Sequence, residues 1–488
     1  MVNVVCALTG ITTMKAQNKA PRCKQRGILA EFRRSQPASA LPSFGAVHLA
    51  IHPCGKSQGI LAKANKTFGD ETTFLKQHTS AVILTESNGK AKIAVSPKLQ
   101  GRVLTSTAAG DTGLSFGWIN RALISSGKTD LHINAYGGED RFWLGPEGGQ
   151  FSIFFKKDAP FDLDHWFTPA AIDTESFDLV TKSNDRIQMK KNIRLENYSG
   201  SVFELRVNRE VIVLEGKDAV KLLNVELPVN KKLGLRQLKT VAGLGEAGPG
   251  SSRFAEPATQ DKPTPATTLK LLDLQLVAYQ SNNRITNTGK TGWDKSTGML
   301  SIWILGMFNP SPSTIIVIPY KTGDEQELGP IVNDAYFGKV PADRLVIGKN
   351  ALFFKGDGQY RGKIGLTPGR AKAVFGSYDP DNKVLTIVQY TKPEGVGDYV
   401  NSMWEIQKDL FRGDTINSYN DGPPKPGAKP LGPFYELETS SPAAALEPGK
   451  STEHVHRTFH LQGDDQRLNR IARSVLGVGV DEIKKAFK

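Results

Sequence analysis

Residues 203–213 read FELRVNREVIV and alternate apolar with polar side chains. Because the side chains of a strand point alternately to its two faces, this pattern predicts a strand with one buried face. Similar β-like segments, separated by Gly, Asn and Asp turns, occupy residues 81–84, 91–95, 151–155, 271–279, 300–307, 314–318 and 384–390. Many short strands with turn residues between them are typical of antiparallel all-β domains. We therefore expect an all-β sandwich of large antiparallel sheets.

One long β-rich region, residues 67–488, follows a leader at residues 1–66. The leader mixes Arg and Lys with Ser, Pro and Ala and has no sustained period, as is typical of a disordered or processed segment. In the body, residues 71–78 predict a short helix. Residues 242–267 are rich in Gly, Pro, Ser, Thr and Ala and predict a surface insertion loop. Helical spacing of apolar residues predicts a short C-terminal helix within residues 465–488.

The basic charge of the chain is concentrated in the leader. The formal net charge is +13, and residues 1–66 hold ten basic side chains and one acidic one. The remaining 422 residues hold 52 basic and 48 acidic side chains, without a clustered basic patch. Apolar runs such as residues 300–308 are shorter than the roughly 18 to 20 residues that span a bilayer. We expect no nucleic-acid partner and no membrane span.

All three cysteines, Cys6, Cys23 and Cys54, lie in the leader. A body without cysteine has no thiolate nucleophile and no thiolate metal site. It also contains neither a Gly-x4-Gly-Lys-Ser/Thr phosphate loop nor a His-Glu-x2-His motif, so we expect no cofactor. Cys54 is a candidate lipid acceptor, and the alternative is an unstructured or mis-started N-terminus. The leader therefore favours a secreted, periplasmic or lipid-anchored location over a cytoplasmic one without settling it.

Residues 132–150, HINAYGGEDRFWLGPEGGQ, gather turn glycines and polar side chains. Glycine lets a backbone approach a ligand closely, and Trp143 offers a flat apolar face to a sugar ring. Carboxylates and Arg141 can hydrogen-bond sugar hydroxyls or a sugar acid. The alternative is that an acid simply pairs with Arg141 while Trp143 packs in the core. The candidate substrate-binding residues of this segment are Glu139, Asp140, Arg141, Trp143 and Glu147.

Two histidines near this segment are candidate acids or bases. His132 begins it, and His165 follows in residues 161–169, FDLDHWFTP. Imidazole titrates near neutral pH, so either ring could move a proton. Trp166, next to His165, is a candidate wall for a sugar subsite. An aromatic turn packed in the core is the alternative for this pair.

Two late strands carry charged faces. Residues 434–438 place Glu436 and Glu438 on one face, opposite Tyr435 and Leu437. Residues 453–460 place three histidines on one face. Because a metal ion wants three or four converging ligands and this pattern shows only a strand, we expect no metal there and a solvated or hydrogen-bonded face instead. The weak metal candidates are His454, His456 and His460.

A family resemblance rests on these same motifs. Gly137-Gly138 with Trp143 and Pro146-Glu147, and a Glu-Leu-Glu strand before Pro448-Gly449, resemble the galactose-mutarotase-like (aldose-1-epimerase-like) superfamily. The runs 137–155, 285–308 and 436–442 are similar to an uncharacterised bacterial family within it. The resemblance covers residues 67–488 and implies a β-supersandwich whose concave face binds carbohydrate.

The resemblance also implies a chemistry. In mutarotases a late carboxylate takes the proton of the anomeric hydroxyl while a histidine protonates the ring oxygen. Glu438, or its neighbour Glu436, stands where that base is expected. The Asn-His-x-x-His loop of the mutarotases is absent, which leaves His132 and His165 as the candidate acids.

Three functions stay open because this fold also occurs in polysaccharide lyases and in noncatalytic domains. The protein is an epimerase-like enzyme, a carbohydrate-binding protein without turnover, or a lyase acting on uronate polymers. In the lyase, Arg141 would neutralise the uronate, and His165 or Tyr136 would act as the base. Each function has a carbohydrate ligand, and none fixes the oligomeric state.

Overall fold

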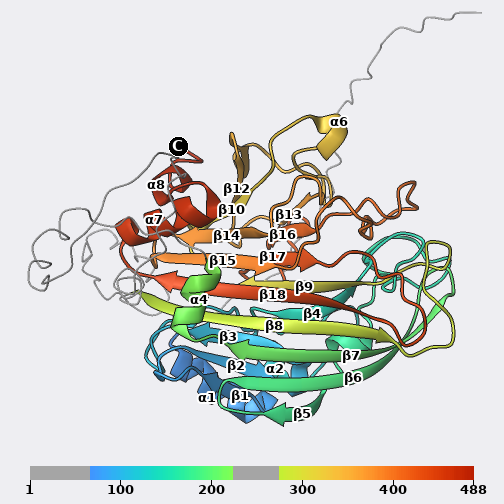
Figure 1. The fold of residues 1–488 in the computed structure, drawn as a ribbon, viewed down its shortest axis with the longest axis horizontal. Coiled ribbons are helices and arrows are strands. Elements are labelled where there is room, and N and C mark those ends of the chain that lie inside the picture. Colours follow the sequence, from blue (N-terminus) through green and yellow to red (C-terminus); the bar gives the residue numbers. More distant parts are fainter. Residues whose placement is uncertain (1–65, 224–273) are drawn as a thin grey trace, which may run out of the picture. The chain divides into compact units, whose positions relative to one another are not determined.

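Antiparallel sheets form the body of the protein in the computed structural model, which describes residues 66–223 and 274–488 (Figure 1). The expected all-β architecture with a short C-terminal helix is confirmed. The expected insertion loop at residues 242–267 and all but the last residue of the expected leader, residues 1–66, lie outside the described residues.

The largest sheet has ten strands. Its order is β11 (Leu345–Ile347), β12 (Ala351–Lys355), β10 (Ile315–Pro319), β14 (Val374–Asp379), β15 (Val384–Tyr390), β18 (Ser451–Gln462), β8 (Gln275–Asn287), β7 (Val202–Val213), β6 (Arg186–Glu196) and β5 (Asp178–Lys182). The predicted alternation on β7 is present, since every second side chain from Phe203 to Val213 is buried.

A five-stranded sheet packs against it. Its order is β13 (Gly362–Leu366), β16 (Ile416–Asn420), β17 (Tyr435–Ser440), β9 (Ser301–Phe308) and β4 (Arg141–Gly145). All five strands are buried along their whole length. Because only one face of this sheet meets the large sheet, its other face must be covered by loops.

A small sheet and short helices complete the described elements. The three-stranded sheet runs β1 (Val82–Thr85), β2 (Lys92–Ser96) and β3 (Arg102–Thr107). The helices are α1 (Phe68–Thr79), the 3-10 turn η1 (Pro97–Leu99), α2 (Arg121–Ser126), α3 (Ala170–Asp173), α4 (Gly216–Leu223), α6 (Glu325–Leu328), α7 (Asp465–Leu476) and α8 (Val480–Ile483). None of the helices in the described ranges is long and apolar enough to cross a membrane.

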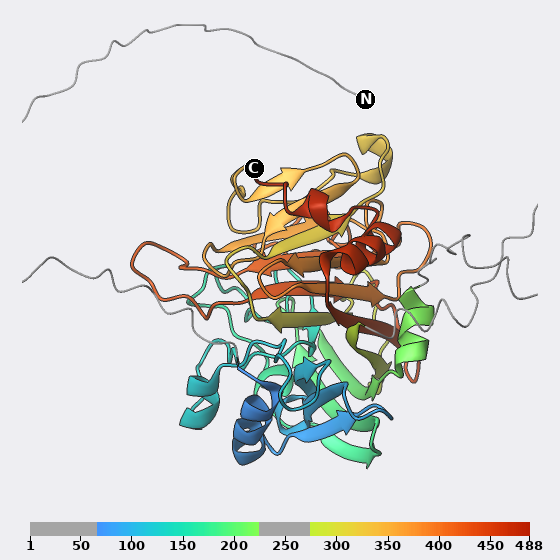
Figure 2. The ribbon, with the colours of Figure 1, turned by 90° about the vertical axis from the view of Figure 1, so that its left-hand side faces the viewer.

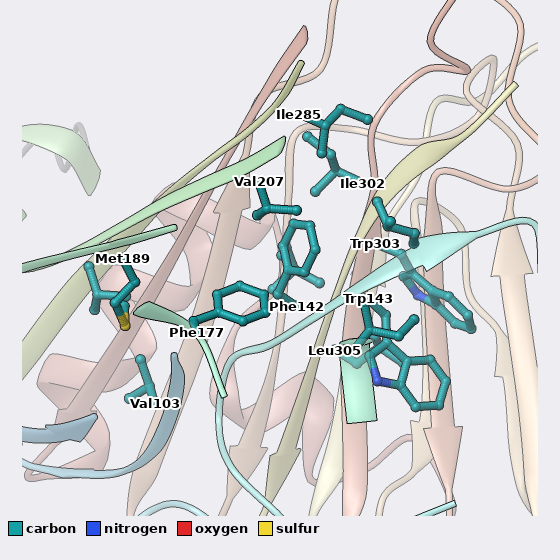
Figure 3. Close-up of a cluster of buried hydrophobic side chains, with 14 of the residues drawn as sticks. Val103, Phe142, Trp143, Phe177, Met189, Val207, Ile285, Ile302, Trp303 and Leu305 are labelled. Atoms are coloured by element: carbon teal, nitrogen blue, oxygen red, sulfur yellow. The ribbon is translucent and has the colours of Figure 1, made fainter. Parts of the chain in front are cut away.

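The main core lies between the two large sheets. Phe142 of β4 and Ile302 of β9 pack in one cluster with Val207 of β7 and Ile285 of β8. Figure 3 shows these side chains on one side of the smaller sheet, with Trp143 and its neighbour Trp303 on the other. The five-stranded sheet therefore has an apolar inner face and a second face free to carry chemistry.

Helices cover part of the outer face of the ten-stranded sheet. Val220 of α4 and Leu468 and Ile471 of α7 share an apolar cluster with Phe459 and Leu461 of β18. Figure 2 shows α4, in green, and α7, in red, on the same side of the sheet. Asp464 caps α7 by accepting from the Arg467 backbone N–H, so this helix begins where its apolar spacing predicts.

One expected strand is absent. Residues 151–155 form bends with a single bridge between Phe155 and Trp166. Here Ser152 donates its hydroxyl to the Glu147 carbonyl and accepts the Phe154 backbone N–H. This side chain supplies backbone partners locally, and the apolar run turns inward as a loop instead of pairing with a strand.

Candidate functional site

A cavity of about 320 Å³ opens on the face of the five-stranded sheet opposite the core. Alternation along β4 turns Phe142 and Leu144 into the core and Arg141 and Trp143 into the cavity. On β17 the same alternation sends Glu436 to the cavity. Each of the five strands contributes at least one lining residue.

Two buried ion pairs form the floor of the cavity. Arg141 donates from Nη2 to Glu436 Oε1 at 2.9 Å. Lys363 Nζ lies 3.3 Å from Glu438 Oε2 and 3.9 Å from Glu147 Oε2. Unpaired buried charges cost several kcal/mol each, so these side chains depend on one another for a stable place in the interior.

Burial sets the protonation of this floor. Desolvation raises the pKa of Glu436 to about 8, although the charge of Arg141 opposes it, and Glu438 adds to the increase. Burial also raises the pKa of Glu147. Burial alone would lower the pKa of Lys363, but the neighbouring carboxylates outweigh it and the pKa is raised. The floor thus combines a permanent ammonium with a carboxyl that exchanges its proton near neutral pH, which is suited to proton transfer.

Four of the six tryptophans of the chain line the cavity. Trp143 meets Trp303 edge-on, with ring centroids 5.6 Å apart. Trp166 stacks on Trp404 at 5.8 Å. Trp303 donates its indole N–H to Glu438 at 3.0 Å, whereas the buried N–H groups of Trp143 and Trp166 have no acceptor among the described residues. The four tryptophans therefore give the cavity a largely aromatic wall.

The loop at residues 421–433, between β16 and β17, forms one side of the cavity mouth. Asp421 accepts the Tyr419 hydroxyl at 2.8 Å and the Gly432 backbone N–H at 2.8 Å. Gly432 packs on Trp118, where an added Cβ would lie 2.0 Å from the ring. These contacts fix both ends of the loop above the sheet.

Most of the expected site residues meet at this cavity. Glu438 has no exposed surface and lies beside the lining, bonded to Trp303 and Lys363. His132 is on the wall, with Nδ1 2.7 Å from the Trp166 carbonyl oxygen. The expected residues in the lining are His132, Arg141, Trp143, Glu147, Trp166 and Glu436.

His165 lies outside the lining. Its Nδ1 is 2.7 Å from Asp162 Oδ1, and both side chains are about half exposed. His165 lies in a turn closed by its backbone N–H to the Asp162 carbonyl, and its side chain is exposed, whereas the next residue, Trp166, is buried.

Glu139 and Asp140 also lie outside the lining, in the interior of the protein. Glu139 accepts from the Ser106 backbone and hydroxyl and from the Tyr279 hydroxyl. Asp140 pairs with Arg209 at 2.6 Å, and neither side chain is exposed. A bridge between Val103 and Asp140 joins this segment to β3 before β4 begins. The two acids therefore tie the small sheet to the large one.

The three late histidines are bound in the same interior. The Thr439 hydroxyl lies 2.8 Å from His454 Nε2 and 2.9 Å from His456 Nδ1. His460 Nε2 lies 3.0 Å from Glu139 Oε2. Burial lowers the pKa of His454 to about 3 and that of His456 to about 4, so both rings are neutral at pH 7. In the part of the chain that the structure describes, no group of three His, Cys, Asp or Glu side chains could hold a metal ion.

Sequence patterns did not single out several lining residues. Lys363 and Arg361 share one face of the short segment Arg-Gly-Lys before and within β13. That alternation indicates that the two basic side chains lie on one face of a strand. Only the pairing of β13 with β16 shows that this face meets the cavity. Trp303 lies within an apolar run, so the sequence does not distinguish it from a core residue. Trp404 lies in a loop without a periodic pattern.

The fold and this cavity define an all-β sandwich protein with a charged, tryptophan-lined site on the outer face of its smaller sheet. The chain belongs to the family of unknown function DUF6786, whose model matches residues 66–242 and 263–487. No curated protein sequence matches the chain.

Solved structures similar to the chain include proteins described as galactose mutarotase-like or aldose 1-epimerase-like. A putative aldose 1-epimerase from Escherichia coli K12 is 14% identical, with a TM-score of 0.41, over 78% of this chain and 99% of that one. A galactose mutarotase-like protein from Lactobacillus casei is 9% identical, with a TM-score of 0.40, over 78% of this chain and 99% of that one. A putative aldose 1-epimerase from Klebsiella pneumoniae is 10% identical, with a TM-score of 0.38, over 82% of each chain.

Proposed function

We propose that the protein binds a carbohydrate in the cavity on the five-stranded sheet. The observation that carries the proposal is the presence, in the lining of one cavity, of four tryptophans and two ion-paired carboxylates, Glu436 and Glu147. Sugar rings have apolar faces that pack on aromatic rings and hydroxyl edges that need charged or polar partners. The volume of about 320 Å³ fits a ligand of one or two rings.

The floor offers hydrogen-bonding capacity to such a ligand. Arg141 uses Nη2 for Glu436, while its Nε and Nη1 have no partner among the described residues. Its guanidinium packs 4.2 Å from the Trp143 ring centroid, which holds it in one orientation. Hydroxyl groups both donate and accept, so they can pair with polar groups of the lining such as Glu436.

Binding can be followed by tryptophan fluorescence of the full chain during titration with neutral and acidic sugars. We expect at least one sugar to change the emission saturably. Trp404→Ala should weaken this binding about tenfold, since an aromatic contact contributes about 0.5–1.5 kcal/mol beyond its buried area. Trp293→Phe is the matched control, because Trp293 packs on Phe203 outside the lining. If no sugar changes the emission, or if both variants bind like the wild type, the proposal is wrong.

A second candidate function is aldose epimerisation, favoured by the carboxyl of Glu436 with its pKa of about 8. A base, Glu436 or Glu438, would take the anomeric hydroxyl proton as the bond from the anomeric carbon to the ring oxygen breaks and the carbonyl forms. An acid would protonate the ring oxygen. Of the two histidines expected for that role, His132 is in the lining and His165 is not.

Polarimetry of freshly dissolved α-sugars tests this activity. The full chain should speed the approach to anomeric equilibrium, and Glu436→Gln should slow it by about 100-fold or more, the usual contribution of an acid or base. Trp293→Phe again serves as the control. If the wild-type chain binds the sugar but leaves its mutarotation rate unchanged, the noncatalytic binding function is the one that remains.

A further inference from the structure

Arg361 lines the cavity without a carboxylate partner. It precedes β13, two positions before Lys363 on the same face. Its guanidinium carbon lies 3.6 Å from the centroid of the Phe337 ring. It makes no ion pair and no side-chain hydrogen bond within residues 66–223 and 274–488, in contrast to Arg141 and Lys363, which hold carboxylates.

Asp421, an acid beside Arg361, already has hydrogen-bond partners. Pairing of Gly362 with Asn420 brings Arg361 alongside Asp421. Both carboxylate oxygens of Asp421 are used, one by the Tyr419 hydroxyl and one by the Gly432 backbone N–H. Burial raises the pKa of Asp421, and the positive charge of Arg361 only partly opposes this increase.

A second cation without a partner stands at the mouth. Lys429, in the loop at residues 421–433, lines the cavity and is exposed. It too has no ion pair among the described residues. Asp164 is the exposed acid of the lining, and it forms no ion pair with either cation among the described residues. On this side of the cavity, within the part of the chain that the structure describes, two cations, Arg361 and Lys429, stand against one acid, Asp421, whose pKa is raised by burial, so this side carries more positive than negative charge.

We propose that the ligand of this cavity is an acidic sugar, a monosaccharide or terminal sugar unit whose carboxylate or phosphate binds Arg361, with Lys429 closing over it. This inference rests on the proposed function, because it assumes that the ring lies on the tryptophans. A ligand that covered a guanidinium without supplying an anion would have to desolvate an uncompensated charge. A guanidinium packed on the Phe337 ring and without a hydrogen-bond partner in the described ranges keeps its N–H groups for an oxyanion, which a guanidinium can bind in a bidentate manner.

The test compares three matched ligands on the full chain: glucuronate, glucose 6-phosphate and glucose. The acidic sugars should bind at least tenfold more tightly than glucose, and their affinity should fall as salt is added. Arg361→Gln should weaken binding of the preferred acidic sugar by about 10- to 100-fold, the range of hydrogen bonds to charged groups, and leave glucose nearly unchanged. Arg361→Lys should recover part of the loss. Arg194→Gln, at an exposed arginine of β6 with no ion pair in the described residues, is the matched control and should behave like the wild type.

The outcomes separate the two proposals. Preference for glucuronate or for glucose 6-phosphate identifies the source of the anion and supports the inference either way. Equal affinity for glucose and the acidic sugars, or an Arg361→Gln chain that keeps the wild-type preference, overturns the inference while the sugar site stands. Binding of acetate or inorganic phosphate as tightly as the acidic sugars overturns it as well, because the ring would then contribute nothing. A chain that binds none of the sugars overturns the proposed function and this inference with it.

Discussion

At the scale of single residues, Lys363 is the charge on which the cavity floor depends. Replacing it by Met leaves the fully buried carboxylate of Glu438 without its cation. Breaking a buried pair from one side typically costs about 3–5 kcal/mol, so we expect the free energy of unfolding to fall by that amount. Denaturant unfolding of Lys363→Met at pH 7 measures it.

Two further variants make this prediction specific. The double variant Lys363→Met with Glu438→Gln removes the orphaned charge and should recover part of the stability. Lys295→Met breaks an exposed pair with Asp398 and should change stability by less than about 1 kcal/mol. Equal losses in the buried and exposed single variants would contradict the assignment.

The raised pKa of Glu436 predicts that its contribution to folding stability decreases as the pH rises, which is opposite in sign to the contribution of a carboxylate whose pKa is lowered by folding. The folded protein raises the pKa of Glu436 from 4.5 to about 8, so folding takes up a proton between these values. The stabilisation is complete below pH 4.5 and is lost as the pH rises through 8, with a slope of at most about 1.4 kcal/mol per pH unit. Asp414 and Glu147 shift in the same direction. The free energy of unfolding should therefore fall less between pH 5.5 and pH 7.5 in Glu436→Gln than in the wild type. Equal decreases in the two proteins would refute this prediction.

Local pattern predicted part of the cavity and missed the rest for a physical reason. The alternation of residues 434–438 correctly puts Glu436 and Glu438 on one face. It cannot say that Arg141 faces this site while Asp140 enters the core, because the face of β4 is decided by pairing with β9, far along the chain. In sequence, Glu139 and Asp140 belong to a dense polar cluster. Such a cluster can contact a ligand or form a buried hydrogen-bond network, so the sequence alone does not tell the two roles apart.

At the scale of elements, alternation of apolar and polar side chains predicts strands with one exposed face, whereas the buried strands β9, β10 and β15 follow from their apolar runs. β7 is an example of the first kind, since solvent on one side leaves a visible period. The five-stranded sheet is buried on both faces, and β13, β16 and β17 carry Gly, Asn, Ser and Glu among their apolar residues. Which strands belong to this sheet is decided by pairing between distant segments, and a short stretch of sequence carries no information about that pairing.

The loop at residues 421–433 gives a prediction at this scale. A Cβ on Gly432 would lie 2.0 Å from Trp118, so Gly432→Ala must lift the loop and shift Leu431 over the cavity. We expect sugar affinity to fall several-fold while the melting temperature changes little, because the loop is largely exposed. Lys425→Ala, in the exposed part of the same loop, should bind like the wild type. Titration by tryptophan fluorescence and a thermal melt together check both statements.

At the scale of the whole molecule, the leader should be dispensable for folding up to a sharp limit. Thr67 caps α1 by accepting the Asp70 backbone N–H, and Phe68 is fully buried. Deletion of residues 1–64 keeps both and should leave the melting temperature within a few degrees of the full chain. Deletion of residues 1–68 removes the cap and a buried aromatic ring, which should cost about 4 kcal/mol or more. An unfolded product from the shorter deletion would show that the leader contributes to the fold.

The distance in sequence between the residues of the cavity floor has a consequence for how the protein acquires its site. Arg141 and Glu436 are 295 positions apart in the sequence. Strand β9 lies between β4 and β17 in the sheet, so the site forms only when strands from distant parts of the chain have paired. Sheets built from such non-local pairings have high contact order and fold slowly. During refolding, the hairpins of β6 with β7 and of β14 with β15 should gain secondary structure first. The ability to quench tryptophan emission with a sugar should then return in the slowest phase, so that ligand affinity reports the end of folding.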